Sequence, residues 1–134
     1  MVSHLSAQTA EMDLVKSRIR QSLSTGLAST TTIAEHQASL QADGTWPDIN
    51  YASTAQTNWP PRTHLERIRS MAKVYAWGSL QGNTTLRDDI FRAYDAWITR
   101  DPQSTNWWYQ SINTPQNLGE ILLLMEAELS PARR

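Results

Sequence analysis

The apolar residues of this chain recur at intervals of three and four, and this spacing limits the fold more than any other feature of the sequence. The clearest stripe comprises Leu118, Ile121, Leu122, Met125 and Leu129, which would lie on one face of a helix. No segment shows the alternation that is typical of a half-buried strand. We therefore predict an all-α fold, built of helical hairpins whose best-defined helices are antiparallel neighbours, with five helices over residues 5–23, 33–40, 63–77, 84–100 and 114–129.

Several residues have the chemistry of helix ends. Thr63, followed three residues later by Glu66, matches a capping box, in which each side chain accepts the backbone N–H of the other residue across the first turn. Thr84 or Thr85 can cap the next helix, and Pro115 suits the first turn of the last one. These signals predict where three of the helices begin.

Composition excludes several classes of function. The 134 residues fit a single domain, and the formal charge of −1 argues against duplex nucleic acid, which needs a concentrated basic face. No apolar run approaches the roughly 20 residues that a membrane helix requires. The absence of cysteine excludes disulfides and thiolate metal sites, and no metal-ligand or cofactor motif stands out. We predict no bound metal, no cofactor and no membrane partner.

Six tryptophans in 134 residues are unusually many beside a single phenylalanine. Four of them fall in two segments that have no helical pattern, residues 41–61 and 101–113. One helical hairpin separates these segments, so both are expected at the same end of the domain. The tryptophans in question are Trp46, Trp59, Trp107 and Trp108.

Tryptophan and asparagine gathered at one end of a helical scaffold have the chemistry of a carbohydrate site. An indole face packs against the C–H face of a pyranose, and an amide such as that of Asn106 pairs with hydroxyl groups. The other interpretation is that the indoles pin the loops onto the helices, which is the favoured one for Trp46 and Trp59. It is weaker for Trp107 and Trp108, since neighbours in an extended segment point to opposite sides.

Two motifs resemble polysaccharide lyase family 8, which includes hyaluronate, chondroitin and xanthan lyases. The stretch Asn106–Pro115 resembles the family's Asn-Trp-Trp signature. The stretch Asp43–Tyr51 resembles its DGSW-x-DI-x-Y segment, and Asn58-Trp59-Pro60 with His64 and Arg67 continues the likeness. The two motifs occur in register between residues 43 and 125, so together they are far more specific than either alone.

The resemblance implies part of an incomplete α/α toroid that forms one wall of a cleft for acidic polysaccharide. It implies that Trp107 and Trp108 belong to an aromatic patch that positions the polysaccharide and that Asn106 contacts sugar. We add Trp46, Trp59 and His64 as candidate substrate-binding residues beside them. The family's catalytic Asn, His and Tyr, and its β-sandwich domains, lie beyond the residues of this chain.

The predicted organisation is one helical domain over residues 1–134, a fragment of a larger toroid, with N-terminal helices in 1–41 and the signature-bearing region in 42–129. The parent protein is expected to be a secreted or periplasmic β-eliminating lyase, whose signal peptide is absent from this chain. We expect no catalysis by the chain alone. The alternative is a free-standing helical module that binds carbohydrate or a partner. We also expect self-association through the apolar side of the last helix, which lacks its next neighbour.

Two local features have competing interpretations. His64 opens a helix beside the aromatic loop, where it either faces the cleft or takes part in the helix cap. The basic residues that follow could attract a polyanion, although a solvated helix face paired with Glu66 explains them better. Family members often carry an acidic residue and a glycine where this chain has Ser111 and Asn113, so the local turn is expected to differ there.

Overall fold

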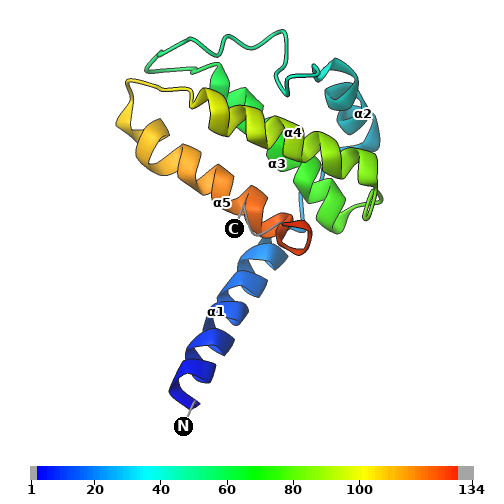
Figure 1. Ribbon diagram of the computed structural model, residues 1–134, viewed down its shortest axis with the longest axis vertical. Coiled ribbons are helices and arrows are strands. Elements are labelled where there is room, and N and C mark those ends of the chain that lie inside the picture. Colours follow the sequence, from blue (N-terminus) through cyan, green and yellow to red (C-terminus); the bar gives the residue numbers. More distant parts are fainter. Residues whose placement is uncertain (1–2, 130–134) are drawn as a thin grey trace.

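The computed structural model describes residues 3–129, with side chains from residue 8 onward, and this part of the chain is helical with no strand (Figure 1). The predicted all-α class is confirmed. The elements are α1 (Ser3–Ser22), α2 (Thr30–Ser39), α3 (Pro61–Trp77), α4 (Thr84–Arg100), a π-helix (Tyr109–Asn113), α5 (Thr114–Leu124) and a 3-10 turn (Glu126–Glu128).

Helix α3 lies at the centre and packs against α2, α4 and α5. A short turn joins α3 to α4 as an antiparallel hairpin, whereas α5 runs parallel to α3, as the pairing of Arg69 with Glu120 and of Tyr75 with Glu128 shows (Figure 1). A hydrogen bond of 2.9 Å from Gln37 to Asp89 links α2 to α4. Helix α3 is therefore the central element of the helical body, and α2 contacts both α3 and α4.

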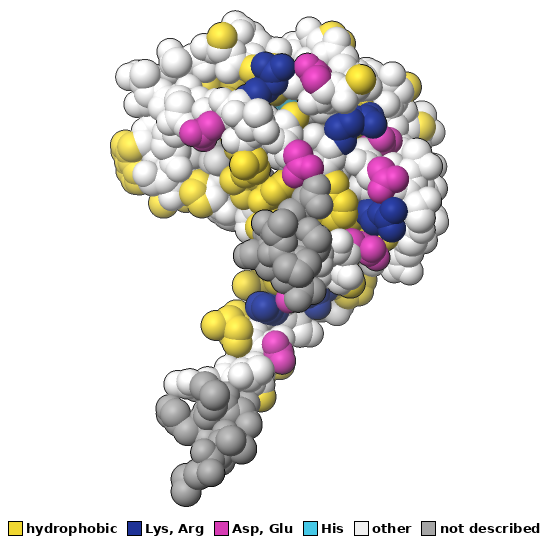
Figure 2. Space-filling model, viewed as in Figure 1, with side chains coloured by type: hydrophobic (Ala, Val, Ile, Leu, Met, Phe, Trp, Pro, Cys, Tyr) yellow, Lys and Arg dark blue, Asp and Glu magenta, His cyan; other side chains and the backbone are white. Residues whose placement is uncertain are grey.

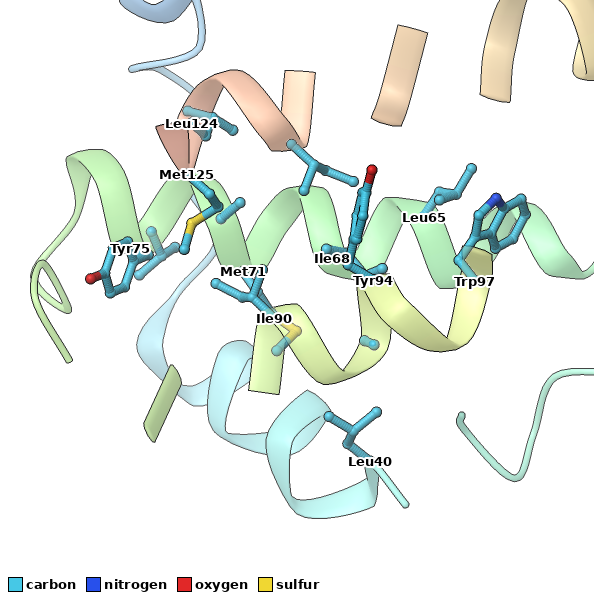
Figure 3. Packing of buried hydrophobic residues seen from close by; sticks show 14 of the residues in the cluster. Leu40, Leu65, Ile68, Met71, Tyr75, Ile90, Tyr94, Trp97, Leu124 and Met125 are labelled. Carbon is cyan, nitrogen blue, oxygen red and sulfur yellow. The ribbon is translucent and has the colours of Figure 1, made fainter. Parts of the chain in front are cut away.

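The hydrophobic core lies along α3 (Figure 3). Leu65, Ile68 and Met71 are each fully buried and face α4 and α5 at helical intervals. Truncating a buried aliphatic side chain of this kind to alanine typically costs about 2–5 kcal/mol. Other large buried side chains of the core include Ile90, Tyr94 and Trp97 of α4, Ile121 and Leu124 of α5, and Met125.

Two of the predicted helix caps differ from those in the structure. Helix α3 begins at Pro61, so Thr63 already lies inside it and the predicted capping box is wrong. Helix α4 is capped by Asn83, whose side chain accepts the backbone N–H of Leu86 at 2.9 Å, and not by either threonine. Asparagine is among the strongest N-cap residues, which explains its preference over the threonines beside it.

Helix α1 projects from the body and turns its apolar stripe to solvent (Figures 1 and 2). Met12, Val15 and Ile19 are 57%, 49% and 43% exposed. The side of α1 that faces the body carries Lys16 and Arg20, and both side chains bind the carboxylate of Glu126, at 3.2 and 2.7 Å. The apolar period correctly predicted a helix here, but it did not show which face would meet the body.

Candidate functional site

The two tryptophan-bearing segments lie side by side at one end of the hairpin, as predicted (Figure 1). Four hydrogen bonds connect them, and each is accepted by a backbone carbonyl of the long loop between α2 and α3. The backbone N–H and the hydroxyl of Thr105 donate to Thr54 at 3.1 and 3.0 Å, the Ser104 hydroxyl to Ala55 at 2.8 Å and the Asn106 amide to Gln56 at 2.9 Å. The long loop therefore holds the segment that leads to Trp107.

Trp46 and Trp59 anchor the long loop from inside. Each is 1% exposed, and each indole N–H donates to a backbone carbonyl, Trp46 to His36 at 2.9 Å and Trp59 to Ser53 at 2.8 Å. An enclosed indole has no face to offer a ligand. Their expected role in contacting substrate is therefore corrected: they stabilise the loop, which is the other interpretation that the sequence left open.

Close packing against α4 sets the position of the loop's first turn. Gly44 has φ of +84°, and a methyl group at its Cα would overlap the backbone carbonyl of Arg92. Only glycine combines this backbone conformation with this approach. Two ion pairs flank the turn: Asp43 with Arg100 at 3.1 Å and Asp48 with Arg67, whose guanidinium donates to both carboxylate oxygens. These pairs hold the pKa of both aspartates below the usual range, together with hydrogen bonds from Thr45 to Asp43.

His64 is fully buried at the junction of the loop, α3 and α4. Its Nε2 lies 2.7 Å from the carbonyl oxygen of Ala93, which can only accept, so Nε2 carries the proton. Nδ1 therefore accepts the hydroxyl of Tyr51 at 2.8 Å, and that hydroxyl in turn accepts the backbone N–H of Trp46 at 2.9 Å. Burial lowers the pKa of His64 to about 4, against the opposing effect of its hydrogen bond to Ala93.

The expectation that His64 contacts substrate is therefore also corrected. The neutral imidazole is enclosed by aromatic rings, with centroids 5.0 Å from Trp46 and 5.4 Å from Tyr51, and both nitrogens are occupied. It neither faces a cleft nor caps its helix. The Tyr51 hydroxyl connects His64 with the backbone of Trp46. The sequence pattern does not predict this role, although Tyr51 ends the motif that begins at Asp43.

Trp107 and Trp108, in contrast, lie on the surface, 69% and 42% exposed. They occupy the first helical turn before the π-helix, so their side chains diverge by about 100° rather than pointing to opposite sides. Asn106 fixes this turn, because its Oδ1 accepts the backbone N–H of Trp108 at 2.9 Å. The ring of Tyr109, which is buried, lies 5.5 Å from that of Trp108 and supports it from below.

The predicted irregular segment 101–113 is accordingly wrong in its second half. The chain is helical from Trp107, and a π-helix over Tyr109–Asn113 leads directly into α5. Ile112, 43% exposed, stands four residues after Trp108 and extends the apolar surface along the same face. The result is a solvent-facing apolar surface of Trp107, Trp108 and Ile112, here called the aromatic platform after its two indoles, on the turn that Asn106 holds.

No helix in residues 3–129 is long and apolar enough to cross a membrane. Within the same range, no three side chains of His, Asp or Glu come together in a way that could hold a metal ion.

Comparison with known proteins shows the family of this chain. The chain matches the family described as polysaccharide lyase family 8, N terminal alpha-helical domain, over residues 2–134. It is 35% identical over 130 residues to chondroitinase-AC of Pedobacter heparinus, an alignment that covers 95% of this chain and 19% of that protein. It is 35% identical over 111 residues to xanthan lyase of Bacillus sp. (strain GL1), covering 69% of this chain and 12% of that protein.

A hyaluronate lyase of Thermasporomyces composti is 29% identical over 107 residues, covering 75% of this chain and 13% of its own length. A solved structure of chondroitinase AC lyase superimposes with a TM-score of 0.78 at 36% identity, over 85% of this chain and 17% of that one. The chain thus spans about a fifth or less of the proteins it matches. It belongs to polysaccharide lyase family 8, as the N-terminal α-helical domain of that family.

Proposed function

We propose that this domain forms a wall of the substrate cleft of a lyase that cleaves acidic polysaccharide, and that its aromatic platform positions the sugar chain. The observation that carries the proposal is the exposure of the adjacent Trp107 and Trp108, 69% and 42%, on a turn that the rest of the domain holds rigidly. Large exposed indoles on a well-ordered surface are typical of interaction sites. The named relatives act on chondroitin, xanthan and hyaluronate.

The chemistry of the platform suits a pyranose. Its C–H face packs on an indole, whose two sides are apolar. Asn106 already uses one lone pair of Oδ1 for Trp108 and one amide hydrogen for Gln56, so a second amide hydrogen and a second lone pair remain for a sugar hydroxyl. Both existing hydrogen bonds are to the backbone, so they orient the amide in advance. They leave the second hydrogen and the second lone pair of the amide available for a ligand. Asn106 is thus proposed as a sugar contact as well as the residue that sets the platform.

The reaction proposed for the whole protein is β-elimination at a uronic acid. It needs a group that neutralises the carboxylate, a base for the C5 proton and an acid for the leaving oxygen. His64 cannot supply the base, because it is fully buried and both ring nitrogens are hydrogen-bonded. We propose that this domain binds and orients the polysaccharide and that other parts of a longer, secreted or periplasmic protein perform the chemistry.

We predict that the double substitution Trp107→Ala/Trp108→Ala abolishes binding of the chain to chondroitin sulfate, hyaluronan or xanthan oligosaccharides. Packing of a pyranose on an indole contributes to the binding free energy by burying apolar area. Removing both indoles removes the surface on which the sugar packs. The measurement is affinity electrophoresis through gels that contain each polymer, followed by calorimetric titration with the one that retards the wild-type chain. The expected loss of affinity is at least tenfold.

Ile98→Ala is the matched control, because Ile98 is 53% exposed and lies on α4, outside the platform of Trp107, Trp108 and Ile112. It should bind as the wild type does. Retention of affinity in the tryptophan double variant would overturn the platform as the sugar site. Failure of the wild-type chain to bind any of the three polymers would overturn sugar binding by this domain.

We further infer that the isolated chain associates with itself, through a different face from the one expected. The apolar side chains of α5 are largely covered, whereas Met12, Leu14, Val15 and Ile19 of α1 are exposed. Two such stripes can cover each other in a helix pair. We predict a concentration-dependent dimer in analytical ultracentrifugation that Val15→Ser/Ile19→Ser converts to monomer. A wild-type chain that stays monomeric at high concentration would contradict the inference.

A further inference from the structure

A hydrogen bond between Ser104 and Gln110 closes a loop of chain that contains both exposed tryptophans. The backbone N–H of Ser104 donates to Oε1 of Gln110 at 2.7 Å. Trp107 and Trp108 lie between these two residues in the sequence, on the turn that leads into the π-helix. Because solvent surrounds much of each indole, packing alone does not fix the two rings. Their position therefore depends on how the backbone of this turn is held.

Gln110 extends the contact into a chain of two side-chain amides. Its Nε2 donates to Oε1 of Gln103 at 2.7 Å, and Nε2 of Gln103 donates to the backbone carbonyl of Asp101 at 3.0 Å. The chain begins at a backbone N–H and ends at a backbone carbonyl, so the polarity of both ends is fixed. Each amide has one orientation that makes both of its bonds. The residue at position 110 must therefore both accept and donate to complete the chain.

The far end of this amide chain lies where α4 stops. Asp101 is the C-cap of α4 and has φ of +46°, a left-handed conformation that is uncommon for residues other than glycine. Such a conformation persists where surrounding contacts hold it. The two amides thus connect the end of α4 with the first turn of the π-helix. We call Gln103 and Gln110 together the amide clamp.

Ser104, which the amide clamp holds, also connects the long loop with the tryptophan turn. The serine is buried, and its hydroxyl donates to the carbonyl of Ala55 at 2.8 Å and accepts the backbone N–H of Asn106 at 3.0 Å. Asn106 in turn accepts the backbone N–H of Trp108 through Oδ1. Hydrogen bonds therefore run without interruption from Gln110 through Ser104 and Asn106 to the backbone of Trp108.

We propose that Gln110 is a positioning residue, which holds Ser104 and thereby orders the two indoles before a sugar chain binds. A surface that is ordered in advance loses less conformational entropy on binding, so its affinity is higher. Gln110 acts through the backbone of the turn and not by touching the ligand. The proposal rests on the proposed function, because it concerns the same aromatic platform.

The test is Gln110→Ala, which removes the bonds to Ser104 and Gln103. Backbone order parameters of Trp107 and Trp108, from nuclear magnetic resonance relaxation, should fall from about 0.85, typical of a rigid backbone, to below about 0.6. Calorimetric titration should show about a threefold to tenfold loss of affinity for an oligosaccharide that binds the wild-type chain, the size expected when one hydrogen bond is lost.

Two further variants separate positioning from a general loss of stability. Gln81→Ala is the matched control, because the Gln81 amide donates to the carbonyl of Ala76 at 2.8 Å in the turn before α4, at the opposite end of that helix from Asp101. It should change neither the order parameters nor the affinity. Gln110→Glu should restore the order parameters, since its carboxylate accepts the Ser104 N–H in a charge-assisted bond.

The outcomes distinguish the clamp from the sugar site. Loss of both order and affinity in Gln110→Ala, with neither lost in Gln81→Ala, supports the proposal. Unchanged order parameters in Gln110→Ala, or fast hydrogen exchange of the Ser104 amide in the wild type, would overturn it. So would reduced order with unchanged affinity, and the platform then stands if Trp107→Ala/Trp108→Ala still loses binding. If the wild-type chain binds no oligosaccharide, the proposed function itself fails, whatever the order parameters show.

Discussion

Replacing Gly44 with alanine is expected to destabilise the domain by about 3 kcal/mol, near the upper end of what single substitutions usually cost. Two effects combine. An L-residue held at φ of +84° is strained, by roughly 1–2 kcal/mol. In addition, the new methyl group would overlap the Arg92 carbonyl and lie 2.8 Å from Cβ of Ala96, so the loop must leave α4. Chemical denaturation at pH 7 measures the change.

Two other glycines of the chain separate these effects. Gly82 has φ of +75°, but a methyl group there meets nothing within 4 Å, so Gly82→Ala should show the conformational cost alone, about 1 kcal/mol. Gly119 lies within α5 with open space around it, so Gly119→Ala should be neutral or stabilising by up to ~1 kcal/mol. A loss for Gly44→Ala no larger than that for Gly82→Ala would show that the close approach to α4 is unimportant.

Acidification is expected to remove about 3 kcal/mol of stability through His64 alone. The pKa of this group is about 4 in the folded state and 6.5 when exposed, and each unit corresponds to about 1.4 kcal/mol. Because the folded-state pKa is the lower one, the unfolded chain binds more protons between pH 6.5 and 4. The contribution is therefore complete above pH 6.5 and disappears as the pH falls to about 4.

The variant His64→Gln tests this directly, because glutamine cannot titrate. The free energy of unfolding of the wild type should fall steeply between pH 7 and pH 4.5, and that of the variant should fall much less. Asp43 and Asp48 do not obscure the result, since their lowered pKa values place their losses below their ordinary 3.8. His36, whose pKa burial also lowers, remains in both proteins.

If His64→Gln proves too unstable to measure, the pH titration of the imidazole resonances of the wild type replaces it. A midpoint near 4 supports the buried neutral histidine. A midpoint near 6.5, or equal pH slopes in the two proteins, would contradict it. Either measurement also reports on the loop, because Tyr51 lies between His64 and the backbone of Trp46.

The helices could be predicted from the sequence because their apolar stripes are long and regular, as in α3 and α4. Their capping residues could not, because a proline or an asparagine one or two residues upstream takes the place of the threonines. In α1 the stripe exists but the ion pairs with Glu126 decide which face meets the body. Periodicity reports that a face is apolar and says nothing of what covers it.

In the candidate site, too, some features could be predicted from the sequence and others could not. The shared end of the two loops followed from the order of the helices, and the family from two motifs in register. The separation of buried Trp46 and Trp59 from exposed Trp107 and Trp108 depends on carbonyls at His36 and Ser53, which no local pattern identifies. The π-helix was beyond prediction for a similar reason, since its extra residue is accommodated by packing against α3 and not by its own sequence.

The unequal exposure of the tryptophans has an optical consequence. Trp46, Trp59 and Trp97 are at most 2% exposed, whereas Trp107 and Trp108 face solvent. The enclosed indoles emit at shorter wavelengths and are shielded from iodide, while the exposed pair emits at the red edge and is quenched. Selective quenching can therefore separate the emission of the proposed sugar-binding surface from that of the three enclosed indoles, with the partly buried Trp77 as the remaining contributor. The domain thus contains its own fluorescent reporter of that surface, with no dye attached.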